Sequence, residues 1–331
     1  MNILVLAGGV SPERDVSLSS ASKIAKALTA SGNRVAVLDL YYGICNVKDL
    51  YFTSNADEIE YYTVPEAAPD CIDTDEIDAY IGRNVPECCQ MADVVYLALH
   101  GDVGENGKLQ AFLDLYKIRY TGSGFDGCML SMDKNLAKAF VAANNIKTAK
   151  WCLNAMDDSI GFPCVIKPVA GGSSIGVSMA ENTKEYEIAM REAKKYDSDI
   201  MIEERIFGRE FSVGILNDSA LPVIEIIPRN NEFYNYKNKY QKGLTNEICP
   251  ADIPCALAKE LKQKAEKIHR ILHLRLYSRI DFIVDNDNNI FFLEANSLPG
   301  MTPASLLPQE AAAIGISYED LCNQIAESAL M

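Results

Sequence analysis

Three side chains with hard oxygen donors lie close together in the segment 277–307, which reads YSRIDFIVDNDNNIFFLEANSLPGMTPASLL. Asp281 is expected at the end of a short apolar strand, IDFIV, and a polar turn at 285–288 returns the chain into a second strand, IFFLEAN. Glu294 and Asn296 are two residues apart on that strand and therefore point to the same face. Because Mg²⁺ prefers carboxylate and amide oxygens and keeps positions open for phosphates, the hairpin is predicted to bind a metal–nucleotide complex. A solvated hairpin edge is the alternative, since acidic residues are common in turns.

A lysine next to a glycine-serine loop is the second chemical signal. The run FPCVIKPVAGGSSIGVSMA predicts a buried strand at 163–166 that delivers Lys167, then a loop with Ser173 and Ser174, then a strand at 175–180. Backbone N–H groups in such a loop can bind phosphate oxygens while the lysine supplies a positive charge. This is not the Walker pattern, in which the loop precedes the lysine and opens a helix. A β-hairpin with a flexible tip is the alternative.

Further carboxylates follow an apolar strand that begins at Met201. Glu203 and Glu204 end that strand, and Glu210 follows Gly208. Carboxylates at a crossover between domains suit the amine of a base or the hydroxyls of a ribose. Their default role in the absence of other signals is a surface salt bridge.

The segment 228–250 is long, polar and aromatic, and it has neither a helical nor a strand period. A loop of this length in a compact domain is either disordered or functional. Its tyrosines and lysines, among them Lys239 and Tyr240, favour a lid that closes on an anion.

The elements that must position these residues begin with an apolar strand at 2–7, which breaks at a Gly-Gly pair and is followed by a helix and a second strand. This order predicts the opening of a doubly wound α/β domain, whose ligands bind beyond the carboxyl ends of the strands. Glu13 lies in the first such loop, and His100 follows the buried strand 94–99, near Glu105. Both could be functional, although a solvated glutamate and a structural histidine are the alternatives.

Composition argues against several classes of protein. The chain has 331 residues, 48% hydrophobic and 23% charged, which predicts a globular protein of two or three domains. Its net charge of -15 argues against nucleic acid as a partner, because nucleic-acid binding requires a basic face. The ten cysteines show neither a CxxC pair nor zinc-ligand spacing, which indicates reduced thiols in a cytoplasmic protein. No targeting or membrane segment is visible in the sequence, so no membrane partner is expected.

Eight motifs, in the same order, resemble the D-alanine:D-alanine ligases of the ATP-grasp superfamily: GGVSPERDVS, HGDVGENGKLQ, MDK, VIKPVAGGSSIGV, EERIFGREF, YNYKNKY, RIDF and LEANSLPGMTPASL. The resemblance covers nearly the whole chain. It implies an α/β fold, α+β in parts, with the three-domain ATP-grasp architecture and a doubly wound parallel sheet in the N-terminal domain. The domains implied are 1–122 on the substrate side, 123–208 in the centre, and 209–331 with the metal site and the lid. A homodimer is also expected from the family.

The resemblance also implies ATP as co-substrate and Mg²⁺ (or Mn²⁺) as cofactor. The metal ligands that it implies are Asp281, Glu294 and Asn296, in agreement with the interpretation of the hairpin. Glu203 matches the residue that meets the adenine amine, and Ile206 matches the backbone contact to the base. The complete set implied for ATP is Lys134, Lys167, Ser174, Glu203, Glu204, Ile206, Glu210 and Lys239.

The reaction implied is the ATP-dependent joining of two D-alanines for peptidoglycan precursor synthesis. The carboxylate of the first D-alanine attacks the γ-phosphate, and the amine of the second attacks the resulting acylphosphate. Arg279 and the backbone N–H of Gly300 match the pair that holds the oxyanion. A hydrogen-bonded set is implied to hold the lid shut and keep water from the acylphosphate: Glu13, Ser173 and Tyr240. The residues implied to contact the amino acids are Glu13, His100, Arg279, Gly300, Ser305 and Leu306, and Ser305 is also placed among the catalytic residues.

The identity of the second substrate stays open. Lys239 and Tyr240 are both present and the lid has no histidine, which favours D-alanine over D-lactate. D-Serine or another small amino acid remains an alternative, as part of a different peptide or secondary-metabolite pathway. A nucleotide-binding regulatory module without turnover is a hypothesis from a different class. Loss of a metal ligand or of Arg279 would favour it, and all of these residues are present.

Overall fold

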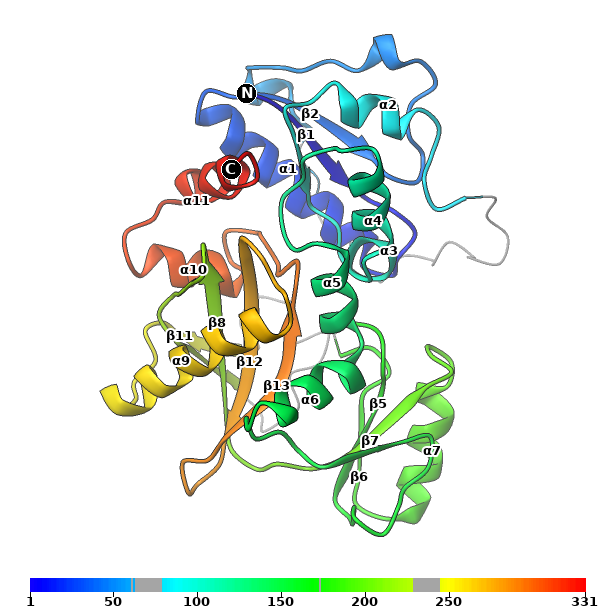
Figure 1. Ribbon diagram of the computed structural model, residues 1–331, viewed down its shortest axis with the longest axis vertical. Helices are drawn as coiled ribbons and strands as arrows, with labels where there is room; N and C mark the ends of the chain where they lie inside the picture. The colour runs from blue at the N-terminus through cyan, green and yellow to red at the C-terminus, as the bar shows by residue number, and fades with distance from the viewer. Residues whose placement is uncertain (61, 63–78, 173, 229–244) are drawn as a thin grey trace.

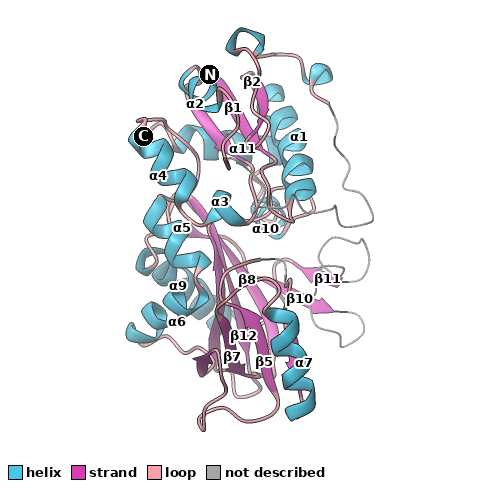
Figure 2. Cartoon of the chain, turned by 90° about the vertical axis from the view of Figure 1, so that its right-hand side faces the viewer, coloured by secondary structure: helices cyan, strands magenta, loops and turns pink. Residues whose placement is uncertain are grey.

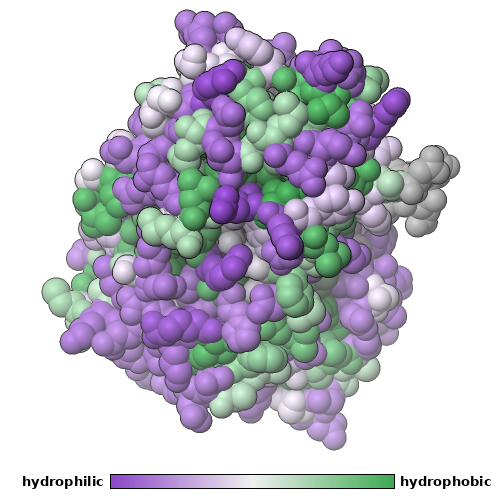
Figure 3. Space-filling model, turned by 45° about the horizontal axis from the view of Figure 1, so that its top comes forward, coloured by the Kyte–Doolittle hydropathy of each residue, from purple (hydrophilic) through white to green (hydrophobic). Residues whose placement is uncertain are grey.

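The computed structural model describes residues 1–60, 62, 79–172, 174–228 and 245–331. Its described strands form three sheets, which we call the N-terminal, central and C-terminal sheets (Figure 1). The face of the molecule seen in Figure 3 carries many hydrophilic residues, with hydrophobic residues scattered among them. Within the described ranges, no helix combines the length and the apolar composition needed to cross a membrane.

The N-terminal sheet is parallel and has β1 in its middle. Its strands, in spatial order, are β2 (Arg34–Asp39), β1 (Asn2–Ala7) and β3 (Val94–Leu97). Five of the six residues of β1 and all four of β3 are buried, which is typical of a parallel sheet covered by helices. The helices of this part of the chain are α1 (Arg14–Ala30), α2 (Val85–Gln90), α3 (Asp102–Glu105) and α4 (Lys108–Leu115), with short 3-10 helices at Val47–Asp49 and Ala56–Glu58.

The last helix of the chain, α11 (Tyr318–Ser328), belongs to the core of the N-terminal sheet. Its buried residues Leu321 and Ile325 are in the same hydrophobic cluster as the residues of β1 and α1. Asn33 Nδ2 donates a hydrogen bond of 2.9 Å to Asn323 Oδ1 across this contact. Figure 1 accordingly shows α11, in red, beside the blue α1.

Two leucines of α4 provide a matched test of this core. Leu113 is fully buried, whereas Leu115 is 83% exposed. We expect Leu113→Ala to lower the free energy of unfolding by about 2–5 kcal/mol, because the substitution leaves a cavity in a packed core. Leu115→Ala is expected to change it by less than about 0.5 kcal/mol. Urea unfolding of the two variants measures the difference, and equal effects would contradict the placement of α4.

The central sheet is antiparallel and small. Its strands, in spatial order, are β4 (Trp151–Leu153), β7 (Ile200–Glu204), β5 (Cys164–Pro168) and β6 (Ser178–Ala180). Helix α7 (Thr183–Ala193) packs on it, and the side chain of Asn182 caps this helix by accepting from Glu185 N. Two helices lead into this part of the chain: α5 (Phe125–Met132) and α6 (Lys134–Ala143).

The C-terminal sheet is antiparallel and larger. Its strands, in spatial order, are β11 (Thr245–Ile248), β10 (Ile224–Pro228), β8 (Arg209–Leu216), β12 (Tyr277–Val284) and β13 (Ile290–Asn296), and β9 (Ser219–Ala220) pairs with β8. Helices α6 and α9 (Cys255–Ile271) lie to one side of this sheet and share a hydrophobic core with it (Figure 2). Helix α10 (Leu306–Ala312) also packs against β8.

The ends of several elements differ from the sequence-based expectations. Asp281 lies in the middle of β12 rather than at the end of a strand, because hydrogen bonds from neighbouring strands satisfy its buried carboxylate. The strand expected at 175–180 begins only at Ser178. The segment predicted as a loop at 228–250 includes β11, which pairs with β10, a strand on the far side of that loop. The domain boundaries at 122 and 208 stay predictions.

Candidate functional site

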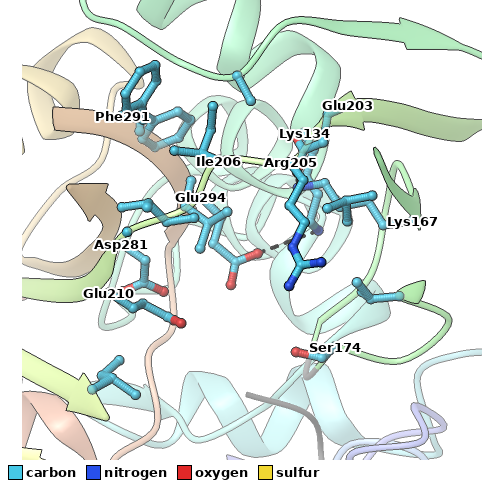
Figure 4. A pocket seen from close by; sticks show the side chains of 18 of the residues that line it. Lys134, Lys167, Ser174, Glu203, Arg205, Ile206, Glu210, Asp281, Phe291 and Glu294 are labelled. Atoms are coloured by element: carbon cyan, nitrogen blue, oxygen red, sulfur yellow. Dashed lines mark hydrogen bonds and ion pairs between the residues drawn. The ribbon is translucent and has the colours of Figure 1, made fainter. Parts of the chain in front are cut away.

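A cavity of about 580 Å³ lies between the central and C-terminal sheets. This volume is in the range of sites that hold a small molecule. Figure 4 shows charged side chains lining it, including Lys167 from the central sheet and Asp281 and Glu294 from the C-terminal sheet. Apolar walls are provided by Ile206 and Phe291. The cavity is therefore able to hold a ligand that is both flat and apolar in one part and charged in another.

The strand register explains how the acidic end of the cavity is built. Asp281 pairs with Ser212 on β8 and with Glu294 on β13, so adjacent strands place their side chains around it. Arg279, two residues before Asp281, pairs with Asn296. The structure thus brings the three predicted metal ligands to one face of one hairpin.

The carboxylate of Asp281 is buried and fully engaged. Arg279 donates to it twice, from Nε to Oδ1 at 2.9 Å and from Nη2 to Oδ2 at 2.8 Å. Ser212 Oγ donates to Oδ1 at 2.6 Å, and Asn296 Nδ2 donates to Oδ2 at 3.1 Å. These four hydrogen bonds occupy the acceptor positions of the carboxylate, so a cation bound by Asp281 would have to displace at least one of the donors.

The donor set of the hairpin fits a hard divalent cation. Among the residues that the structure describes, no three His, Cys, Asp or Glu side chains gather as a metal site. The predicted set instead has two carboxylates and one amide, and oxygen ligands of this kind suit Mg²⁺. Asn296 uses its Nδ2 toward Asp281, so its Oδ1 is the atom left for a metal.

A buried cluster of three charges lies at the opposite wall. Glu203 accepts from Lys167 Nζ at 2.6 Å and from Lys138 Nζ at 2.5 Å, and all three side chains are at most 5% exposed. Burial alone would raise the pKa of Glu203, but the two lysines lower it to about 2. Burial lowers the pKa of Lys138, against the attraction of Glu203. The ring of Trp151 is 5.1 Å from Lys138 Nζ, which adds a cation–π contact.

Lys138 is a member of this buried cluster that sequence reasoning missed, and it pairs with Glu203 rather than lining the cavity itself. It lies four residues after Lys134 in α6, so the two lysines share a face of the helix. That spacing is the only signal the sequence offered, and a second lysine on a helix face is usually solvated. Arg205 and Phe207 were also missed, although both line the cavity.

The other residues predicted for ATP also line the cavity. Lys134 Nζ donates to the carbonyl oxygen of Gly171 at 2.6 Å and is 4.0 Å from Glu294 Oε2. Glu204 accepts from the backbone N–H of Lys150 at 2.9 Å. The remaining residues of the predicted ATP set that line the cavity are Ser174, Ile206 and Glu210. Lys239 lies outside the described residues.

Residues of the N-terminal part reach the same region. Glu13 is buried, and a Cβ atom built on Gly172 would lie 3.1 Å from its Oε2, so its carboxylate faces the glycine-serine loop. His100 is buried with Nε2 3.4 Å from Ser20 Oγ. Burial lowers the pKa of His100, and the carboxylate of Glu13 opposes this shift. Ser173 and Tyr240, the partners predicted for Glu13, lie outside the described residues.

Glu105 is a further carboxylate in this region, and its side chain is half-buried. It accepts from the backbone N–H of Gly101 at 2.5 Å and lines a cavity of about 30 Å³ together with Lys134 and Asn296. Burial and the negative charge of Glu13 raise the pKa of Glu105 to about 8. Its place shortly after His100, beyond the carboxyl end of a buried strand, was the sequence signal, but its contact with the backbone N–H of Gly101 was not visible.

Three of the residues predicted to contact the amino acids lie beyond the linings of both cavities: Gly300, Ser305 and Leu306. Ser305 Oγ is 2.9 Å from Thr302 Oγ1, and a Cβ atom built on Gly300 would lie 3.0 Å from it. The side chain of Leu306 is buried in a cluster with Ile224 and Ile226. A substrate at this position would therefore meet the backbone of Leu306 rather than its side chain.

Comparison with known proteins agrees with this arrangement. The D-ala D-ala ligase N-terminus family matches residues 2–123, and the D-ala D-ala ligase C-terminus family matches residues 135–327. A D-alanine–D-alanine ligase of Pediococcus pentosaceus is 43% identical over 340 residues, which cover 98% of this chain and 96% of that protein. A D-alanine–D-alanine ligase of Lacticaseibacillus casei is 37% identical over 100% of this chain and 96% of that protein.

A solved structure is similar over the whole chain as well. It is a D-alanine–D-alanine ligase from Bacillus anthracis complexed with ATP, with a TM-score of 0.77, 27% identity and coverage of 100% of this chain and 97% of that one. A cavity between two antiparallel sheets, preceded by a parallel sheet, is the architecture of the ATP-grasp class of enzymes. Within that class, the chain belongs to the D-alanine–D-alanine ligase family.

Proposed function

We propose that this protein joins two D-alanines to D-alanyl-D-alanine, with conversion of ATP to ADP and phosphate, for peptidoglycan precursor synthesis. The observation that carries the proposal is the charge arrangement of the large cavity. Lys134 and Lys167 line it, and Asp281 and Glu294 lie at the hairpin that borders it. Membership of the D-alanine–D-alanine ligase family supports the choice of substrates.

We assign different parts of ATP to different residues of the cavity. Ile206 and Phe291 offer apolar surface to the base, and the carboxylate of Glu203 is kept ionised by its lysines, so that it can accept from the adenine amine. Glu210 would accept from the ribose. Lys167 would exchange its contact with Glu203 for a phosphate oxygen, which Lys138 permits because it still pairs with Glu203.

Asp281, Glu294 and Asn296 would hold Mg²⁺ (or Mn²⁺), which when bound offsets the negative charge of the phosphates. The carboxylate oxygen of the first D-alanine, with its ammonium near Glu13, attacks the γ-phosphorus, and ADP leaves. The amine of the second D-alanine attacks the carbonyl carbon of the acylphosphate. Arg279 would stabilise the oxyanion that forms, and phosphate leaves with its bonding electron pair as the peptide bond is completed.

A small amino acid other than D-alanine, such as D-serine, is an alternative acceptor, and the residues that favoured D-alanine, Lys239 and Tyr240, lie outside the described residues. Two further parts of the proposal are a homodimer and a cytoplasmic location. Both have their support in the family.

The experiment that tests the proposal is ADP release by the purified protein with Mg²⁺, ATP and D-alanine, with the products identified by mass. We expect ADP and a dialanine mass with D-alanine, and neither with L-alanine or D-lactate as the only amino or hydroxy acid. If ADP appears only with D-serine or another acceptor, the ATP-dependent ligation stands and the dialanine product is wrong.

A further inference from the structure

Glu310 is a buried carboxylate that none of the roles above uses. It lies on α10 and its exposed fraction is 0%. Its Oε2 accepts from the backbone N–H of Gly214 at 2.8 Å, whereas its Oε1 has no hydrogen-bond partner in the described part of the chain. A buried carboxylate oxygen without a partner is costly, so its position needs a reason.

Gly214 places this carboxylate beside the acidic hairpin. On β8, Gly214 pairs with Arg279 of β12, and Ser212, two residues earlier, pairs with Asp281. Residues two apart share a face of a strand, and Ser212 contacts Asp281 on the cavity face. A Cβ atom at position 214 would lie 2.2 Å from Glu310 Oε2. The absence of a side chain at Gly214 is therefore what lets Glu310 lie next to Arg279, on the same face as Asp281.

Electrostatics shows that the three groups interact. Burial raises the pKa of Glu310 well above its ordinary value, the Gly214 N–H and the positive charge of Arg279 oppose this, and the negative charge of Asp281 adds to it. The positive charge of Lys262 also opposes the rise, from α9. Glu310 is thus a second acidic group within the field of Arg279, which donates two hydrogen bonds to Asp281.

We propose that Glu310 is a positioning residue that accepts the guanidinium of Arg279 when a divalent cation takes Asp281. The exchange would give Oε1 of Glu310 the partner it lacks and keep Arg279 at the site. It would also move the positive guanidinium of Arg279 away from Asp281, the carboxylate that binds the cation. This inference depends on the proposed function only in that the hairpin binds a divalent cation. An alternative role for Glu310 is purely structural, as the acceptor that fixes α10 to Gly214.

Direct binding of Mn²⁺ in the presence of ADP, without amino acid, separates the two roles. Free Mn²⁺ can be quantified by its electron paramagnetic resonance signal, so bound Mn²⁺ follows by difference, and the readout does not require turnover. Glu310→Gln keeps the size of the side chain and an acceptor for the Gly214 N–H, but it cannot ionise when the guanidinium approaches. We expect its affinity for Mn²⁺ to fall about tenfold, the size typical of losing a partner behind a metal ligand. The control variant, Glu319→Gln, makes the same substitution at an exposed position on α11 and should bind Mn²⁺ as the unaltered protein does.

A double-mutant cycle with Arg279→Met gives the decisive comparison. Without the guanidinium there is nothing for Glu310 to accept, so Glu310→Gln should leave Mn²⁺ affinity unchanged in the Arg279→Met background. The proposal is wrong if Glu310→Gln leaves the affinity unchanged in the presence of Arg279, or lowers it equally in both backgrounds. Should Glu310→Gln fail to fold, Glu310→Ala replaces it in the same cycle. Failure of D-alanine ligation would leave these binding results interpretable, because no amino acid is present.

Discussion

Glu294→Gln is expected to abolish ADP formation while the protein keeps its fold. Glu294 is directly opposite Asp281 in the hairpin, and its side chain lines the large cavity. The substitution preserves size but leaves the predicted cation with a single carboxylate. Removing one preorganised group that stabilises developing charge, such as an oxyanion-hole donor, typically costs about 10²–10³-fold in rate, and by analogy we expect at least a 100-fold loss.

The control for this variant lies on the same hairpin. Asp287→Asn removes the same charge from the exposed turn, and we expect near-normal turnover from it. ADP release with saturating ATP and D-alanine measures both variants, and thermal unfolding checks that each is folded. Near-normal turnover of Glu294→Gln would overturn its assignment as a metal ligand.

Glu203→Gln is expected to lower the free energy of unfolding by about 3–5 kcal/mol, because it leaves two buried lysines without a counter-charge. Lys138 and Lys167 have side-chain exposures of only 1% and 5%. The exposed pair of Glu192 and Lys195 provides the comparison, with exposures of 50% and 61%. Glu192→Gln should change stability by less than about 1 kcal/mol. Urea unfolding at neutral pH measures both, and a small effect of Glu203→Gln would contradict the buried cluster.

The same residue predicts a pH dependence. The pKa of Glu203 is about 2 in the folded protein and 4.5 in its ordinary state. A carboxyl group with a lowered pKa contributes stability above its ordinary pKa and loses it as the pH falls toward the folded value. The free energy of unfolding of the unaltered protein should therefore fall between about pH 4.5 and pH 2. In Glu203→Gln this contribution is already absent, so acid should lower its stability less over the same range. Acid titration of the two proteins should show a flatter slope for the variant in this window.

The acidic hairpin could be predicted from sequence because its geometry is local. Glu294 and Asn296 follow the two-residue period of a strand, and a short polar turn brings Asp281 opposite them. Strands β1 and β3 could likewise be predicted, because each is a continuous run of apolar residues in the sequence. When two strands that pair are adjacent in the sequence, the two-residue period and the residues of the turn are sufficient to predict their pairing.

The rest depended on distant parts of the chain. Lys138 becomes a member of the site only because Glu203, 65 residues later, is folded against it. Glu310 is buried at Gly214, 96 residues away, and a glutamate among alanines on a helix reads as solvated. The strand β11 was missed because its pairing with β10 spans a long loop. No local pattern records these pairings, since each is decided by the packing of the whole molecule.

The position of α11 has a consequence for how the protein is made. The hydrophobic cluster that begins at Ile3 is completed by Leu321, Cys322 and Ile325, and the contact between Asn33 and Asn323 joins residues 290 positions apart. During synthesis, the first sheet would emerge from the ribosome long before the helix that covers it. Part of the apolar surface of the N-terminal sheet therefore stays exposed to water until α11 has been synthesised. A chain interrupted before residue 318 would retain every predicted metal and nucleotide residue and still lack the cover of its first core.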